Sequence, residues 1–287
     1  MPRTKNLDLT QGIIWKQLLL FLLPIAAGTL FQQFYSTVDA IVVGRFLGSD
    51  ALAAVGGSAA VIVQLVVGIF TGLSSGATVV ISHGYGADDQ EKLTRAVHTS
   101  IAFSLLGGIF ITVVGILLTP QSLVWLKNPQ EIMADATLYL RWYFVGTIPM
   151  LLFNMGSGIL RAVGDSKRPL YFSAVASVAN VFLDLLFVAG MNMGAGGAAI
   201  ATEISELISL IWAFVYLKKH QPGMLTLNPQ QYKIHGPTAK TVLKIGIPSS
   251  FQYLFIDLSF VFVNSIINSY GVIAASAVAV GSQVVNL

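Results

Sequence analysis

The sequence predicts an all-α membrane protein, a polytopic bundle of transmembrane helices, and three observations support this. Of the 287 residues, 55% are hydrophobic and only 10% are charged. The mean hydropathy is correspondingly high, at +0.75. Soluble domains carry about a quarter charged residues, so a chain this poor in charge cannot cover a water-facing surface. The third observation is a series of apolar stretches, each long enough to cross a bilayer.

Seven complete spans are predicted, because a span needs roughly 20 mostly apolar residues. The first continues too long for a signal peptide and lacks a small-residue cleavage site, so it is interpreted as a permanent span. An eighth stretch begins near Ile273 and reaches Leu287 after about 15 residues, too few to cross a bilayer, which predicts a chain truncated at its C-terminus. The complete spans cover residues 15–44, 51–82, 96–118, 136–160, 170–190, 195–217 and 242–269.

Lys and Arg are concentrated on one side of the predicted spans. The N-terminus and the second, fourth and sixth loops hold thirteen of the 16 basic residues, and the other side holds Arg45, Lys127 and Arg141. Basic loops stay in the cytoplasm, so the N-terminus is predicted to be cytoplasmic. All four histidines lie in the cytoplasmic segments or, for His98, within the first turn of a span at its cytoplasmic end, which disfavours a histidine metal site inside the membrane.

A polar stretch rich in Pro, Gly and Asn divides the chain, and the sequence after it resembles the beginning. Leu23-Pro24 corresponds to Ile247-Pro248. From the proline to the next matched glycine there are 32 residues in the first copy and 33 in the second. This pattern favours two parallel six-helix repeats, an arrangement found in transporters, over a bundle of unrelated helices. The predicted parts are an N-terminal six-helix lobe over 1–219, a cytoplasmic linker over 220–240, and the first one or two helices of a second lobe over 241–287.

Five acidic residues lie within the predicted spans, where each charge costs at least about 2.5–3.5 kcal/mol. No Lys or Arg lies deep in the spans to neutralise them, so a proton or a metal cation is the expected partner. The five are Asp39, Asp184, Glu203, Glu206 and Asp257.

Two of these acids are predicted to lie at the same depth. Asp39 and Asp184 each stand six residues before the outer end of a span, about 9 Å below the boundary at 1.5 Å per residue. Thr202 reaches a similar level in the sixth span, and Asn180 shares a helical face with Asp184. These oxygens suit a shared proton or Na⁺, a hard cation, and so predict a coupling-ion site. The alternative is that both acids lie at a wet helix end.

The remaining acids and one proline are assigned to the transport path. Glu203 and Glu206 are three residues apart and either line a cavity for cationic solutes or cap a helix start. Asp257 is expected to face the same substrate cavity. Pro24 removes a backbone hydrogen bond in the inner part of the first span and is predicted to give it a functional bend.

Several motifs together resemble the multidrug and toxic compound extrusion (MATE) family, and their order and spacing extend over essentially the whole chain. The first is Leu23-Pro24 followed by Asp39 and then Val43-Gly44-Arg45-Phe46-Leu47-Gly48. The second is the stretch from Arg161 to Lys167, RAVGDSK. The third runs from Asn180 to Asp184 and continues with GAAIAT, which ends at Thr202.

The resemblance implies a twelve-helix antiporter of the plasma (inner) membrane, in which Na⁺ or H⁺ entry drives export of small amphipathic or cationic compounds. It needs no cofactor beyond the coupling ion, and it implies that the missing C-terminal half is required for transport. In the DinF-like branch, the cation site matches Asp39, Asn180, Asp184 and Thr202, with Asn154 from the fourth span. Asn154 lies close to cytoplasmic Arg161, and a bend around Gly156 and Gly158 would reconcile this depth.

Three other functions remain as alternatives. A flippase of the same superfamily would carry an anionic lipid-linked precursor and should have a cavity lined with Arg and Lys, whereas Arg141 is the one basic residue placed in the membrane region. An enzyme is disfavoured, because the sequence has no HExxH, no GxGD and no base beside Ser157. A channel stays open, since ion-binding acids alone do not distinguish coupling from conduction.

Overall fold

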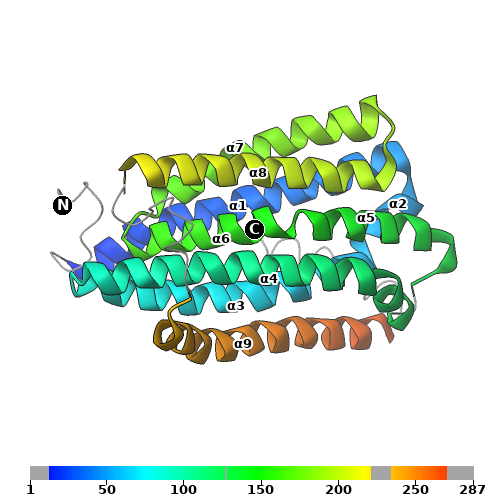
Figure 1. The fold of residues 1–287 in the computed structure, drawn as a ribbon. Helices are drawn as coiled ribbons and strands as arrows, with labels where there is room; N and C mark the ends of the chain where they lie inside the picture. The colour runs from blue at the N-terminus through cyan, green and yellow to red at the C-terminus, as the bar shows by residue number, and fades with distance from the viewer. Residues whose placement is uncertain (1–12, 127, 221–233, 270–287) are drawn as a thin grey trace.

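The structure is a computed structural model that describes residues 13–126, 128–220 and 234–269, and within these ranges all regular structure is helical (Figure 1). The all-α prediction is thereby confirmed. The predicted eighth span, most of the predicted linker, and Lys127 lie outside the described residues. The helices are α1 (Ile14–Leu47), α2 (Ser49–Gly56), α3 (Ser58–Gly86), α4 (Gln90–Trp125), α5 (Met133–Val145), α6 (Thr147–Ala162), α7 (Lys167–Asp184), α8 (Gly194–His220) and α9 (Gly236–Ser269), with a 3₁₀ turn η1 (Gln130–Ile132) and a π-helical turn η2 (Leu185–Gly190).

Five described helical stretches are long and apolar enough to cross a membrane, and a bent pair makes a sixth. The second of these stretches joins α2 to α3 and the fifth predicted span joins α7 to η2. The helix α9 corresponds to the seventh predicted span and is 34 residues long. The helix α1 runs through Pro24 as one element, so the residue that lacks an N–H lies inside a continuous helix.

The fourth span is broken at Gly146, between α5 and α6, by a bend of 48°. The bend thus lies ten residues before Gly156, and both Gly156 and Gly158, where a bend would have reconciled the depth of Asn154, lie inside α6. The break is supported from α4, where the Thr112 hydroxyl donates to the Phe144 carbonyl at 2.8 Å. This hydrogen bond from outside the span satisfies a carbonyl beside the break, which inside a membrane has no water to accept from.

The helices pack side by side along their length (Figure 1). The helix α1 packs on α7, α7 on α8, and α8 on α5 and α6, while α3 packs on α4 and α6. The largest buried cluster lies where α3, α4 and α6 meet, and it includes Ile81, Val97 and Ile159. Large apolar side chains on the outer faces remain exposed, as on a surface that meets lipid.

The helix α9 packs closely on α3 through small residues. A Cβ atom on Gly76 would meet the backbone of Gly246, and one on Gly72 would meet the backbone of Ser250. The Ser250 hydroxyl donates to the Ile69 carbonyl across this interface at 2.6 Å. Small residues and interhelical hydrogen bonds of this kind hold helices together in lipid, where apolar surfaces gain little by association.

Candidate functional site

Asn180, Asp184 and Thr202 lie together between α7 and α8. Asn180 and Asp184 are one helical turn apart and both are fully buried, with 0% of their surface exposed. The Asn180 Nδ2 donates to the Thr202 Oγ1 at 3.3 Å. Asp39 comes from α1, which packs along α7, and it lies close enough to Asp184 for the two charges to interact. The π-helical turn η2 begins directly after Asp184, and such turns often occur at functional sites.

The oxygens of this group lack donors. The Oδ1 atoms of Asp39 and Asn180 and both carboxylate oxygens of Asp184 are buried without a hydrogen-bond partner in the described part of the chain. An unpaired buried acceptor costs about 1–3 kcal/mol, and more where the group is charged. A proton or a hard cation removes this cost, because both bind to oxygen. The residues present therefore fit a bound Na⁺ or a shared proton.

The acids Glu203 and Glu206 form a second group with tyrosines from α1 and α5. The charges of Glu203 and Glu206 interact with each other and with the phenol of Tyr35. Tyr143 is 6% exposed and also lies within range of Glu203. The Glu203 side chain lies over Gly146, so that a Cβ atom there would collide with the carboxyl group. One acid of this group thus touches the bend in the fourth span.

Tyr139 connects the two acidic groups. Its phenol lies within electrostatic range of Asp39, Asp184 and Glu203. Tyr139 and Tyr143 are stacked one turn apart on α5, with ring centroids 6.5 Å apart. These tyrosines were not predicted from the sequence. Their spacing of four residues within an apolar span was the available signal, but it is equally common among tyrosines that only pack.

Asp257 lies at a different place, on α9 and facing α3. Its Oδ1 accepts a hydrogen bond from Gln64 Nε2 at 3.0 Å. Its Oδ2 would be 2.9 Å from a Cβ atom on Gly68. Among the described helices α9 packs on α3 and α4, whereas Glu203 and Glu206 are on α8. The structure therefore does not bring Asp257 to the acids with which the sequence grouped it.

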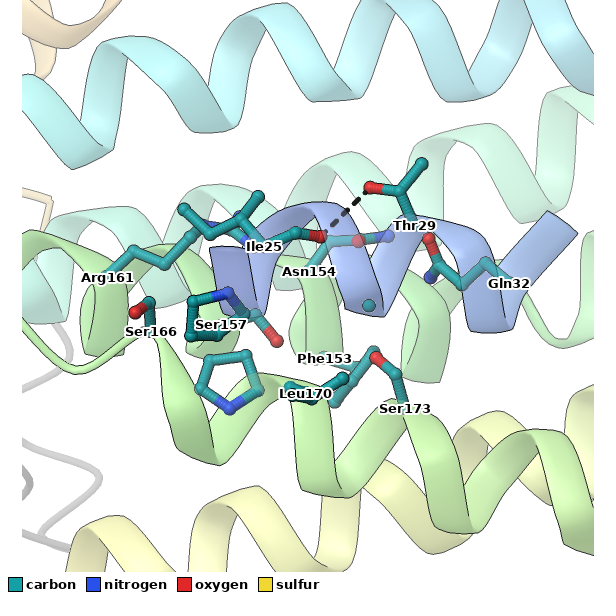
Figure 2. A pocket seen from close by; sticks show the side chains of 13 residues that line it. Ile25, Thr29, Gln32, Phe153, Asn154, Ser157, Arg161, Ser166, Leu170 and Ser173 are labelled. Carbon is teal, nitrogen blue, oxygen red and sulfur yellow. Dashed lines mark hydrogen bonds between the residues drawn. The ribbon is translucent and has the colours of Figure 1, made fainter. Parts of the chain in front are cut away.

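Asn154 lines a polar cavity between α1, α6 and α7 (Figure 2). Arg161, Thr29 and Gln32 line the same cavity. Within the described ranges no hydrogen bond joins Asn154 to Asn180, Asp184 or Thr202. The structure thus brings Asp39, Asn180, Asp184 and Thr202 together and places Asn154 with Arg161.

The described residues hold no group of three or more His, Cys, Asp or Glu side chains that could bind a metal ion. The site on α1, α7 and α8 instead combines two carboxylates with an amide and a hydroxyl. Such a donor set lacks the soft or imidazole ligands that transition metals prefer, and it suits a hard monovalent cation or a proton.

Comparisons with known proteins agree on one family. Residues 24–186 match the MatE family. The probable multidrug resistance protein YpnP of Bacillus subtilis is 32% identical over 271 residues, which cover 93% of this chain and 59% of that protein. The multidrug export protein MepA of Staphylococcus aureus is 24% identical over 276 residues, 95% of this chain and 60% of that protein.

Solved structures give the same result. A MOP superfamily transporter from Pyrococcus furiosus superposes with a TM-score of 0.90 at 25% identity and covers 99% of this chain and 63% of its own. A MATE crystal structure in a bent conformation gives a TM-score of 0.87 at 26% identity, over 96% of this chain and 61% of its own. The chain thus spans about three fifths of the length of the curated relatives it matches.

Proposed function

The chain belongs to the MatE family, and from this premise we propose that the protein exports small amphipathic or cationic organic compounds in exchange for Na⁺ or H⁺. The names of the relatives, which are multidrug resistance and multidrug export proteins, support the export of such compounds. The observation that supports exchange with an ion is the set of buried oxygens on Asp39, Asn180 and Asp184 that have no hydrogen-bond partner in the described part of the chain.

The coupling ion binds, in this proposal, at Asp39, Asn180, Asp184 and Thr202. No Lys or Arg is among the charges that act on either carboxylate in the described part of the chain. Entry of one monovalent cation therefore halves the negative charge of a pair of carboxylates that no side chain neutralises. Because a bound cation and a cationic substrate repel each other, occupancy of the site by one disfavours the other, which is the requirement for antiport.

Glu203 and Glu206 would face the substrate, and Tyr35 and Tyr143 would supply aromatic surface beside them. A cationic amphipathic compound needs negative charge and aromatic faces together, and this group has both. Asn154 makes no hydrogen bond to the residues of the proposed ion site in the described part of the chain, and Asp257 lies at the α3–α9 interface.

The inner part of α1 bends at Pro24 during transport in this proposal. A proline in a helix removes one backbone hydrogen bond, so a bend there costs less than elsewhere in the helix. Exchange of Pro24 for alanine should restore the hydrogen bond and slow transport without lowering thermal stability. Transport at the wild-type rate in Pro24→Ala would rule out this role of the bend.

The proposed topology has the N-terminus in the cytoplasm of a plasma (inner) membrane protein, with lobes over 1–219 and from 241 onward joined by a linker. The concentration of Lys and Arg on one side supports the orientation.

The experiment reconstitutes the protein, expressed from its complete reading frame, in vesicles loaded with a fluorescent organic cation. An inward Na⁺ gradient and an inward proton gradient are imposed separately. Gradient-driven release is expected, and the effective gradient identifies the ion.

The alternatives give different outcomes in the same vesicles. A flippase would move a fluorescent lipid-linked precursor between leaflets while leaving the organic cation inside. A channel would pass ions without driving release of the dye. Either result would overturn the export proposal.

A further inference from the structure

Two polar cavities lie beside α6, and Asn154 and Arg161 line both of them. The first has a volume of about 80 Å³ and lies against α1 and α7 (Figure 2). The second has a volume of about 240 Å³ and lies against α3 and α9. The second holds several waters or one polyatomic ion, since a single water needs roughly 10–15 Å³.

Arg161 has no acidic partner among the described residues, and the local backbone explains why. The chain leaves α6 through Gly164, whose φ is +84°. Its N–H donates to the Arg161 carbonyl at 3.0 Å, while the Asp165 N–H donates to the Leu160 carbonyl at 2.9 Å. These two hydrogen bonds form a Schellman motif, which ends the helix and turns the chain away from Arg161.

Asp165, the acid nearest to Arg161 in sequence, is bound elsewhere. Its Oδ2 accepts a hydrogen bond from Arg168 Nη1 at 2.6 Å. Its Oδ1 accepts from the Arg168 backbone N–H at 3.3 Å, at the start of α7. Asp165 is only 5% exposed and therefore fixed in this arrangement. The positive charge of Arg161 thus remains directed at the cavities.

The walls of the larger cavity offer donors and no carboxylate. Ser74 and Ser75 come from α3, Asn154 from α6 and Tyr253 from α9. The side chains of Ser74, Ser75 and Asn154 have no hydrogen-bond partner in the part of the chain that the structure describes. A guanidinium group with hydroxyl and amide donors, and without an acid, attracts a negative ligand and repels a cation.

We propose that the larger cavity binds a phosphate-type oxyanion through Arg161, with Ser74, Ser75 and Asn154 as further donors. The planar guanidinium donates two parallel hydrogen bonds to two oxygens of a phosphate group, and the serine hydroxyls donate to the remaining oxygens. An interaction between the Arg161 charge and the partial negative charge at the C-terminus of α6 would by itself explain an arginine in the last turn. It does not explain why three other donors around it lack partners.

The phosphate group can come from free inorganic phosphate or from an anionic lipid headgroup. Arg161 lies at the same end of the bundle as Lys167 and Arg168, where headgroups of the cytoplasmic leaflet are predicted to lie. Both sources present the same oxygens to the guanidinium. The binding itself requires neither export nor an ion gradient, so it can be tested apart from the proposed function.

The test measures thermal unfolding of the protein from its complete reading frame, purified in non-ionic detergent. One arm adds sodium phosphate, compared with sodium chloride at equal sodium concentration and ionic strength. The other adds phosphatidylglycerol, compared with phosphatidylcholine. A ligand that binds the folded state raises Tm with concentration and then saturates. We expect Arg161→Gln to raise the half-effective concentration about tenfold or more.

Matched variants separate binding at the cavity from a general effect of charge. Arg141→Gln removes the same charge outside the cavity and should respond like wild type. Arg161→Lys and Ser75→Ala should retain a weaker response, and they keep the test valid if Arg161→Gln fails to fold. A response to phosphate identifies a free anion, and a response to phosphatidylglycerol alone identifies a headgroup. No saturable response to either probe, or responses unaltered in all three cavity variants, would overturn the proposal.

Discussion

Four buried oxygens on Asp39, Asn180 and Asp184 lie without donors in the described chain, and the proposed ion site is based on them. The Asn180 amide nitrogen donates a hydrogen bond to the Thr202 hydroxyl, while its amide oxygen has no partner and can bind a cation together with the carboxylates. Two nearby acids in an apolar surrounding cannot both stay charged without a cation. We therefore propose that the site binds a positive charge, either a proton or Na⁺.

Thr202→Val tests whether the hydroxyl belongs to the ion site. The substitution keeps the shape, removes the acceptor for Asn180 Nδ2, and should cost about 1 kcal/mol of stability. The rise in Tm that Na⁺ or acid produces in wild type should also become smaller. The measurement is thermal unfolding of the purified protein as the ion concentration is varied.

Thr202→Ser is the matched control, because it keeps the hydroxyl and should keep the ion response. A full ion response in Thr202→Val would remove Thr202 from the proposed site while leaving the carboxylates in place.

Residue spacing predicted part of this site and could not predict the rest. The spacing of four between Asn180 and Asp184 placed them on one face of a helix, as the structure has them. Helix depth also brought Thr202 to their level. The neighbours Tyr35 and Tyr139 depend on which helices touch, and that is not encoded in spacing along one helix.

At the scale of the helix, the break at Gly146 sets the relative directions of α5 and α6, and with them the directions of their side chains. The Glu203 carboxyl group occupies the space that a side chain at Gly146 would need. Gly146→Ala should therefore displace Glu203 and destabilise the protein by about 1–3 kcal/mol, as overpacking does. Chemical or thermal unfolding of the variant measures this cost.

A double-mutant cycle gives the control for this contact. In a Glu203→Ala background the added methyl group at position 146 has room, so its cost should fall below about 1 kcal/mol. An equal cost in both backgrounds would show that Glu203 does not limit the bend.

Contact between α3 and α9 depends on glycines with no room for a side chain. Gly76→Leu should push α9 away, because a Cβ atom there already meets the backbone at Val242 and Gly246. The 287 residues contain no cysteine, so Gln64→Cys with Asp257→Cys introduces a unique pair on these two helices. A short thiol cross-linker should join the pair efficiently, and Gly76→Leu should abolish the product.

Gly86→Leu is the matched control, since a Cβ atom at Gly86 meets nothing within 4 Å and cross-linking should persist. Equal cross-linking in Gly76→Leu would contradict the close approach of α3 and α9.

Element boundaries were more predictable than breaks. All seven predicted spans coincide with described helices, and six of them, counting the bent pair as one, are long and apolar enough to cross a membrane. The bend at Gly146 was missed although the fourth span contains Pro149, three residues after Gly146, which has no N–H to donate to the Val145 carbonyl beside the break. The hydrogen bond from Thr112 also lies beside Gly146 and not beside Gly156 or Gly158, and a tertiary contact of this kind is encoded by no local pattern.

At the scale of the whole molecule, the connections α3–α4 and α6–α7 lie at one end of the bundle, while α1–α2 and α7–α8 lie at the other (Figure 1). Lys92, Arg95, Lys167 and Arg168 stand at the first end. An excess of Lys and Arg marks the cytoplasmic side. The molecule therefore has a basic end and an end poor in basic residues, and the membrane orientation is predicted from them.

Two turn residues test this orientation. Asp88 and Asn192 both have positive φ, 54° and 51°, and lie at opposite ends of the bundle. In intact cells a membrane-impermeant thiol reagent should label Asn192→Cys and leave Asp88→Cys unlabelled until the cells are permeabilised. Because both positions share one backbone conformation, they control for each other. The reverse labelling pattern would invert the topology.

Composition predicted that the molecule is an all-α membrane protein, but it did not predict which helices pack against one another. The predicted helices are apolar on all sides, so no face is marked as the one that packs. The proposed coupling site depends on the pairing of α1 with α7 and of α7 with α8. For this reason the sequence predicted the acids and their depth but not their tyrosine partners.

The most direct test of ion coupling compares release of the organic cation from vesicles for wild type, Asp39→Asn and Asp184→Asn. Asp135→Asn is the control, since Asp135 is an exposed acid in the first turn of α5. Wild type and Asp135→Asn should release the compound when the effective ion gradient is imposed, and either site variant should lose at least about nine tenths of that rate, as expected when a group essential for coupling is removed. Gradient-driven release at the wild-type rate in both Asp39→Asn and Asp184→Asn would contradict the assignment of the coupling site.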